Sequence, residues 1–247
     1  MNKEEYIYGT RAVIEAIKEG RSVDKVLVKK GLSNELFSEL LPLMKDNSIP
    51  FQFVPVEKIN RITRKNHQGV LALLSPIEFE DIEMLLPGLF ESGAEPLILA
   101  IDKVTDVRNF GAIARSAECG GVHAIIIPRK GTARIGADAV KTSAGALNYI
   151  PVCKSPNLAS SVRFLKNSGL RIIAATEKAE KYYTDSKMDV PLCIVLGSED
   201  KGISQEILDL ADEQIRIPLY GKIESLNVSA AAALIIFEAA RQRRLIP

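Results

Sequence analysis

The stretch "LILAIDKVTDVRNFGAIARSAE", residues 97–118, decides the fold class of this chain. Its first five residues form an unbroken apolar run, which is typical of a parallel strand covered on both faces. The residues after it carry apolar side chains at helical spacing. These are Phe110, Ile113, Ala114 and Ala117. A buried strand followed by an amphipathic helix predicts an α/β unit.

The same alternation continues through residues 96–247. The predicted strands cover residues 97–101, 124–127, 171–176, 192–196 and 214–217. The predicted helices between them cover residues 109–119, 157–167 and 204–210. Because most of these strands are continuous apolar runs, we expect one large domain with a parallel sheet.

Residues 1–75 predict a second, smaller α/β domain. Its helices are expected at residues 9–18 and 33–47, and its strands at 25–30, 50–55 and 69–75. Ser33 is the expected cap of the second helix. Residues 76–95 contain six Asp or Glu, no Lys or Arg, and Pro-Gly in the middle. This composition predicts an acidic linker between the domains that carries a short helix over residues 82–86.

Composition limits the possible classes of protein. The 247 residues are 47% hydrophobic and 26% charged, as in a globular chain. The three cysteines show no CxxC spacing, which favours a reducing compartment and argues against a zinc site. No apolar run approaches the ~20 residues of a membrane helix, and no signal peptide is visible. We therefore expect a cytoplasmic protein without a membrane or metal partner.

Charge is distributed unevenly although the formal net charge is only +1. Residues 1–75 and 96–247 are each net basic, and the acidic segment separates them. Two basic blocks are able to attract a polyanion. Solvated charged faces without a ligand explain the same pattern equally well.

The last predicted helix, "LNVSAAAALIIFEAA" from Leu226, is apolar or small around nearly its whole circumference. Such a helix has no face suited to water, so it belongs in a core or at a subunit interface. We expect a homodimer formed through this helix, with burial inside one subunit as the alternative.

Polar residues follow three of the predicted strands, at residues 102–115, 197–204 and 217–231. Open α/β sheets hold their ligands at the carboxyl ends of strands. Each stretch alone has a purely structural explanation, because Asn109 and Asn227 are also good helix caps and Gly197 a good turn residue.

Taken together, N-x-G-x-x-x-R from Asn109, G-S-E-x-x-G from Gly197 and S-L-N-V-S-x-A from Ser225 resemble the three motifs of the SpoU (TrmH-like) family. These are RNA ribose 2′-O-methyltransferases of the SPOUT class. The resemblance covers essentially the whole chain and is strongest to the subgroup that methylates a guanosine ribose in 23S rRNA. The stretches "YGTRAVIEAI" and "HQGVLA" resemble the family's N-terminal RNA-binding domain, which is similar to ribosomal protein L30e.

The resemblance implies a trefoil-knotted parallel-sheet domain at residues 96–247, S-adenosylmethionine as cofactor and a homodimer. It also implies that main-chain groups near four residues hold the cofactor. They are Thr176, Gly197, Ile217 and Leu226. S-adenosylmethionine has no pyrophosphate, which explains why no G-x-G-x-x-G follows the first strand.

The resemblance assigns the chemistry of the site to Arg115. An arginine stays protonated at neutral pH and is a poor base, but its planar group can grip a phosphate with two hydrogen bonds. We expect it to hold the RNA 3′-phosphate and to assist deprotonation of the 2′-hydroxyl. Residues expected to orient it and the ribose are Asn109, Glu199, Ser225 and Asn227.

RNA affinity is expected from the basic residues of the first 75. The candidates are Arg11, Lys29, Lys30, Arg61, Arg64 and Lys65. Two alternatives to a 23S rRNA enzyme remain open at this point: a tRNA guanosine 2′-O-methyltransferase, and a non-catalytic RNA-binding assembly factor.

Overall fold

A four-stranded sheet organises the first part of the chain. Its strand order is β1-β4-β2-β3, with β2 antiparallel to β4 and parallel to β3. The strands are β1 (Tyr6–Tyr8), β2 (Val23–Lys29), β3 (Phe51–Val54) and β4 (Val70–Leu74). The helices are α1 (Thr10–Lys18), α2 (Glu35–Asp46) and α3 (Val56–Asn60). The computed structural model describes residues 6–47, 49–198, 200–223 and 225–243.

Apolar faces explain this arrangement. Helices α1 and α2 pack Val13, Leu40 and Met44 against one face of the sheet, while α3 packs Ile59 with Leu71 on the other. The expected cap at Ser33 is wrong by one residue. The side chain of Asn34, in extended conformation, accepts a hydrogen bond from the Phe37 amide at 2.8 Å and starts α2 instead.

A parallel seven-stranded sheet organises the rest. Its order is β7-β6-β5-β10-β8-β11-β9, and every neighbouring pair is parallel. Its strands are β5 (Leu97–Asp102), β6 (Ala124–Pro128), β7 (Val152–Ser155), β8 (Arg171–Ala175), β9 (Lys181–Tyr182), β10 (Leu192–Gly197) and β11 (Glu213–Arg216). The α/β fold class and the parallel sheet predicted from the sequence are confirmed.

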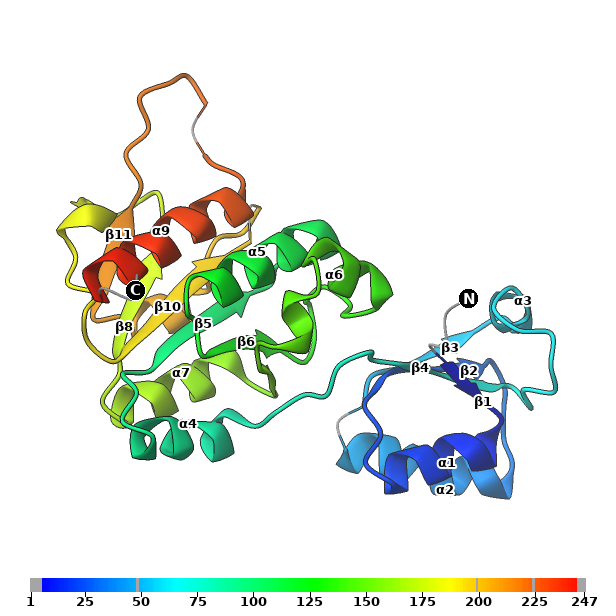
Figure 1. Ribbon diagram of the computed structural model, residues 1–247. Coiled ribbons are helices and arrows are strands. Elements are labelled where there is room, and N and C mark those ends of the chain that lie inside the picture. Colours follow the sequence, from blue (N-terminus) through cyan, green and yellow to red (C-terminus); the bar gives the residue numbers. More distant parts are fainter. Residues whose placement is uncertain (1–5, 48, 199, 224, 244–247) are drawn as a thin grey trace. The chain divides into compact units, whose positions relative to one another are not determined.

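Helices cover both faces of this sheet (Figure 1). Helices α5 and α9 lie on one face, and α4 and α7 on the other. The bounds are α4 (Ile82–Glu91), α5 (Val107–Cys119), α6 (Ala137–Thr142), α7 (Leu158–Asn167), α8 (Gln205–Leu208) and α9 (Val228–Arg243), with 3-10 turns η1 (Ala146–Asn148) and η2 (Tyr183–Asp185). None of the helices in the described ranges combines the length and the apolar character of a membrane span.

The division of the chain differs in detail from the expected linker at residues 76–95. Residues up to Glu78, with Ile135–Ala137, form one compact unit, and the chain from Phe79 onward forms most of the other. Helix α4 is longer than expected and buries Ile82 and Leu86 in the core of the larger unit. Apolar side chains at helical spacing thus make most of the acidic segment a packed part of that unit.

Helix α9 is buried on one side and exposed on the other. Ile235 and Ile236 are buried, and a Cβ placed on Gly120, the residue that caps the end of α5, would lie 2.2 Å from Ile236 Cγ2. The glycine therefore permits the close approach of α5 and α9. On the opposite side, Leu234 and Phe237 are 43% and 50% exposed. Burial inside the subunit thus accounts for one side of this helix, and the dimer through its exposed side stays a prediction.

Candidate active site

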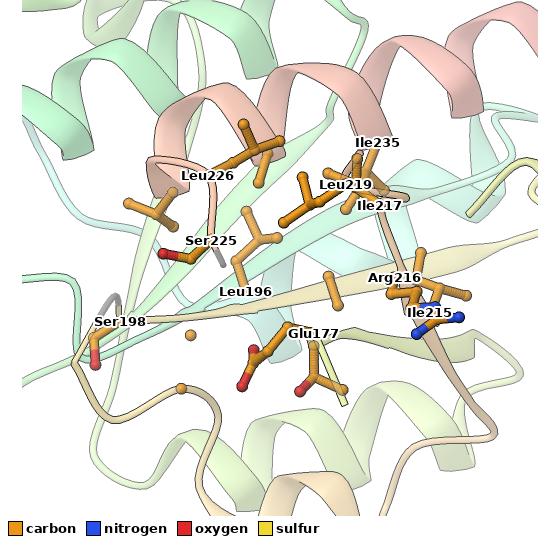
Figure 2. A pocket seen from close by; sticks show the side chains of 16 residues that line it. Glu177, Leu196, Ser198, Ile215, Arg216, Ile217, Leu219, Ser225, Leu226 and Ile235 are labelled. Atoms are coloured by element: carbon orange, nitrogen blue, oxygen red, sulfur yellow. The ribbon is translucent and has the colours of Figure 1, made fainter. Parts of the chain in front are cut away.

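Three strand ends and the start of α9 surround a pocket in the larger unit (Figure 2). The strands are β8, β10 and β11, whose carboxyl ends lie at the same edge of the parallel sheet. The space between the lining residues is about 750 Å³, its open mouth included. They are Ala175, Thr176, Glu177, Leu196, Gly197, Ser198, Gly202, Ile215, Arg216, Ile217, Leu219, Ser225, Leu226, Val228, Ala231 and Ile235. All four residues expected to hold a cofactor are among them.

Glycine shapes one wall of this pocket. The chain turns back after β10 so that the Gly202 amide donates to the Ser198 carbonyl at 2.9 Å. A Cβ on Gly197 would lie 2.2 Å from the carbonyl carbon of Gly202, which no side chain can tolerate without a shift of the backbone. Gly202 itself has a φ of +62°, the left-handed conformation that glycine adopts readily.

Asp102 holds the end of the same loop. It is the last residue of β5 and lies opposite Gly197 in the sheet register. Its buried carboxylate accepts a hydrogen bond from the Ser204 amide at 2.8 Å, just before α8. Asp102 was not among the predicted site residues. An acidic residue that directly ends a buried apolar strand was the available signal.

A hydrogen bond joins the first and third motifs. The Asn227 side-chain amide donates to the Asn109 side-chain oxygen at 2.9 Å, across 118 positions of sequence. Asn227 also accepts from the Ser229 amide at 3.0 Å and so caps α9. Asn109 does not cap α5, because Asp106 does so by accepting from the Asn109 amide at 3.1 Å.

The remaining predicted catalytic residues do not all lie at the pocket. Ser225 lines the pocket, whereas Arg115 is exposed on α5 and lies outside it. No residue of the described part of the chain forms a hydrogen bond or ion pair with its guanidinium. Six positions, or about 9 Å of helical rise, separate Arg115 from Asn109. Glu199 lies outside the described residues.

Two charged side chains in the pocket were not predicted. Glu177 follows β8, and Arg216 ends β11 with its guanidinium 5.1 Å from the centre of the Tyr182 ring. The other described lining residues are apolar or uncharged. The sequence signal that was overlooked is a carboxylate two positions after a buried strand.

The six basic residues expected to bind RNA all lie near one edge of the four-stranded sheet, here called the basic edge. They are Arg11, Lys29, Lys30, Arg61, Arg64 and Lys65. Strands β1, β2 and β3 end at this edge and β4 begins there. The Lys30 amide donates to the Val54 carbonyl at 2.9 Å, and Lys65 Nζ lies 5.5 Å from the centre of the Tyr8 ring.

The described residues offer no metal site. They contain no group of three or more His, Cys, Asp or Glu side chains suited to a metal ion. Burial raises the pKa of Cys153 and of Cys193 to about 12, so both stay protonated thiols at neutral pH.

Comparison with known proteins identifies the family. The model of the SpoU rRNA Methylase family matches residues 96–237, and the model named RNA 2′-O ribose methyltransferase substrate binding matches residues 6–80. This chain belongs to the SpoU methylase family. A TrmH family tRNA/rRNA methyltransferase of Staphylococcus aureus is 35% identical to this SpoU methylase over 96% of each chain.

Two solved structures share the fold of this SpoU methylase. The AdoMet-bound rRNA methyltransferase of Sinorhizobium meliloti matches 98% of this chain and 87% of its own, with a TM-score of 0.62 and 23% identity. The TrmH/SpoU tRNA modifying enzyme of A. aeolicus matches 66% of this chain and 85% of its own, with a TM-score of 0.56 and 31% identity. The SpoU methylase described here is thus an RNA 2′-O-ribose methyltransferase.

Proposed function

We propose that this SpoU methylase transfers the methyl group of S-adenosylmethionine to the ribose 2′-hydroxyl of a guanosine in 23S rRNA. The observation that carries the proposal is the pocket at the ends of β8, β10 and β11. The second and third motifs line it, and the Asn109–Asn227 hydrogen bond attaches the first motif beside it.

The pocket suits an adenosine-containing cofactor. Leu196, Ile217 and Leu226 offer apolar surface of the kind that a purine ring needs, and Thr176, Ser198 and Ser225 add polar groups to the lining. When bound, S-adenosylmethionine supplies a methyl group on a positively charged sulfur: the C–S bond breaks as the bond to the ribose oxygen forms, S-adenosylhomocysteine leaves, and the hydroxyl proton passes to water. The chain's task is to place the hydroxyl in line with that methyl group.

In this proposal Arg115 acts on the RNA. Its exposed guanidinium has no partner among the described residues, so its N–H groups are available to donate two hydrogen bonds to a phosphate. A phosphate held there fixes the adjoining ribose, and the nearby positive charge favours loss of the hydroxyl proton. Asn109 and Asn227 orient the two helices that border the acceptor ribose. Ser225 and Glu199 complete the acceptor side in the same proposal.

The proposal includes the trefoil knot and the homodimer that the family resemblance implies. The Asn109–Asn227 contact is consistent with a C-terminal segment threaded through a preceding loop. The exposed Leu234 and Phe237 of α9 supply an apolar surface that a second copy would cover.

Replacing Leu234 with aspartate is expected to dissociate this dimer. A charge in an apolar interface is costly, whereas the exposed position leaves the subunit core intact. Sedimentation equilibrium measures the result, and Met84→Asp, at a residue 81% exposed on α4, is the matched control. A variant at position 234 that stays fully dimeric would place the interface elsewhere.

The choice of 23S rRNA over tRNA rests on the smaller unit. The A. aeolicus tRNA modifying enzyme matches two thirds of this chain, whereas the S. meliloti rRNA methyltransferase matches nearly all of it. The test compares methyl acceptance by 23S rRNA and by bulk tRNA, both from cells that lack the gene. We expect acceptance by the rRNA. Acceptance by tRNA alone favours the tRNA alternative, and acceptance by neither favours the assembly factor.

We propose that the basic edge binds the RNA backbone. Substitutions that remove the positive charges of Arg61 and Arg64 together are expected to weaken RNA binding. They are also expected to reduce the slope of the logarithm of the RNA association constant against the logarithm of the salt concentration by ~2, because two phosphate contacts no longer release counterions. Arg61 and Arg64 border an open hollow beside α3. Filter binding at several salt concentrations measures both quantities.

The matched control removes Arg21 and Lys45. Arg21 precedes β2 and Lys45 lies in the last turn of α2, so both lie toward the opposite edge of the four-stranded sheet. Equal losses in the two double variants would show that affinity follows total charge and not the basic edge.

A further inference from the structure

Glu177 brings a carboxylate to the pocket that the reaction itself does not use. It lies two positions after the end of β8, and Figure 2 shows its side chain at the pocket, opposite Ser225 and Leu226. In the sheet register Ala175 of β8 lies beside Leu196 of β10, so the chain around Glu177 runs next to Gly197.

The carboxylate is free to accept hydrogen bonds from a ligand. No residue in the described part of the chain forms a hydrogen bond or ion pair with Glu177. The other charged lining residue, Arg216, is positioned over the Tyr182 ring. A carboxylate has two acceptor oxygens and no donor, so it needs a partner with hydroxyl or N–H groups.

We propose that Glu177 binds the ribose hydroxyls of S-adenosylmethionine, an inference that rests on the proposed function of the pocket. Carboxylates that follow a strand in open α/β sheets make this contact with the ribose of nucleotide cofactors. Two neighbouring hydroxyls match the two oxygens of one carboxylate, each hydrogen bond being strengthened by the negative charge.

The ammonium group of the methionine part is the competing partner for a carboxylate. The methyl group must reach the RNA beside Asn227, and the loop that carries Ser225 leads directly into that residue. The methionine end of the cofactor therefore belongs on the Ser225 side of the pocket. Glu177, on the opposite side, is left to the ribose.

The test measures binding to the full-length protein by calorimetry, with no methyl transfer involved. The probes are S-adenosylhomocysteine, 5′-methylthioadenosine, which lacks the ammonium and carboxylate, and 3′-deoxy-5′-methylthioadenosine. Glu177→Gln is expected to bind the first two probes roughly tenfold more weakly, since a charge-assisted hydrogen bond is lost. The unchanged protein is expected to bind 3′-deoxy-5′-methylthioadenosine more weakly than 5′-methylthioadenosine by a similar factor. The Glu177→Gln protein is expected to bind these two probes with equal affinity. Glu180→Gln, an exposed carboxylate outside the pocket, is the matched control.

Each other outcome overturns a defined part of the inference. If the loss in Glu177→Gln appears with S-adenosylhomocysteine but not with 5′-methylthioadenosine, the carboxylate binds the ammonium group and the ribose assignment is wrong. If Glu177→Gln binds like Glu180→Gln, Glu177 contributes nothing. If the unchanged protein binds neither of the first two probes, the pocket is not a cofactor site and the proposed function fails with the inference.

Discussion

Replacing Arg115 with alanine is expected to slow single-turnover methyl transfer by ~30- to 1,000-fold, the typical loss when a charged donor at a reacting centre is removed. The affinity for S-adenosylmethionine is expected to change little, because Arg115 lies outside the pocket. The fold is expected to persist, since the side chain is exposed on α5. Arg115→Lys is expected to recover little activity, because an ammonium cannot reproduce a planar grip with two hydrogen bonds.

Arg108→Ala is the matched control for this experiment. Arg108 is also exposed on α5, seven positions earlier and so on a similar side of the helix. Cofactor affinity and single-turnover rate are measured for all three variants. A loss of cofactor affinity in proportion to rate would make Arg115 a cofactor or folding residue. Near-normal turnover would make it an ordinary solvated side chain.

Replacing Gly197 with alanine is expected to abolish measurable cofactor binding and to lower the free energy of unfolding by roughly 2–4 kcal/mol. The new Cβ would meet backbone atoms on the far side of the loop, 2.2 Å away at Gly202 and 2.4 Å away at the Ile203 nitrogen. Backbone cannot rotate aside as a side chain does, so the wall of the pocket must move.

Gly221→Ala controls for the added methyl group. Apart from its two chain neighbours, no described residue has a heavy atom within 4 Å of a Cβ at Gly221, which is in the loop between β11 and α9. We expect its cofactor affinity and thermal unfolding to match those of the unchanged protein. A Gly197→Ala protein that binds S-adenosylmethionine normally would show that this loop does not shape the cofactor site.

Long apolar runs and helical periodicity predicted much of the larger unit. Five strands and the helices α5, α7, α8 and α9 lie close to their expected positions, whereas α6 was not predicted. Buried parallel strands have few alternatives to a continuous apolar sequence. The two strands that were missed are short or polar. β9 has two residues, and β7 reads "VCKS", so neither carries a recognisable pattern.

Contacts between segments that are distant in the sequence could not be predicted from local sequence patterns. The Asn109–Asn227 hydrogen bond and the support of Ser204 by Asp102 depend on the order of strands in the sheet. The basic edge is of the same kind, because its six residues come from separate segments of the chain that only the strand directions bring to one edge. The sequence pattern pointed to the residue types, and the topology determines which of them are neighbours.

The most direct test of the proposed reaction is nucleoside-resolved mapping of methyl groups in RNA. Purified protein and S-adenosylmethionine are incubated with 23S rRNA from cells that lack the gene, and the digested RNA is analysed by mass spectrometry. We expect a new 2′-O-methylguanosine at one position, which is absent from the RNA of the untreated deletion strain and is made much more slowly by Arg115→Ala. A methyl group on a base, on the ribose of another nucleoside, or on no residue of 23S rRNA would contradict the proposal.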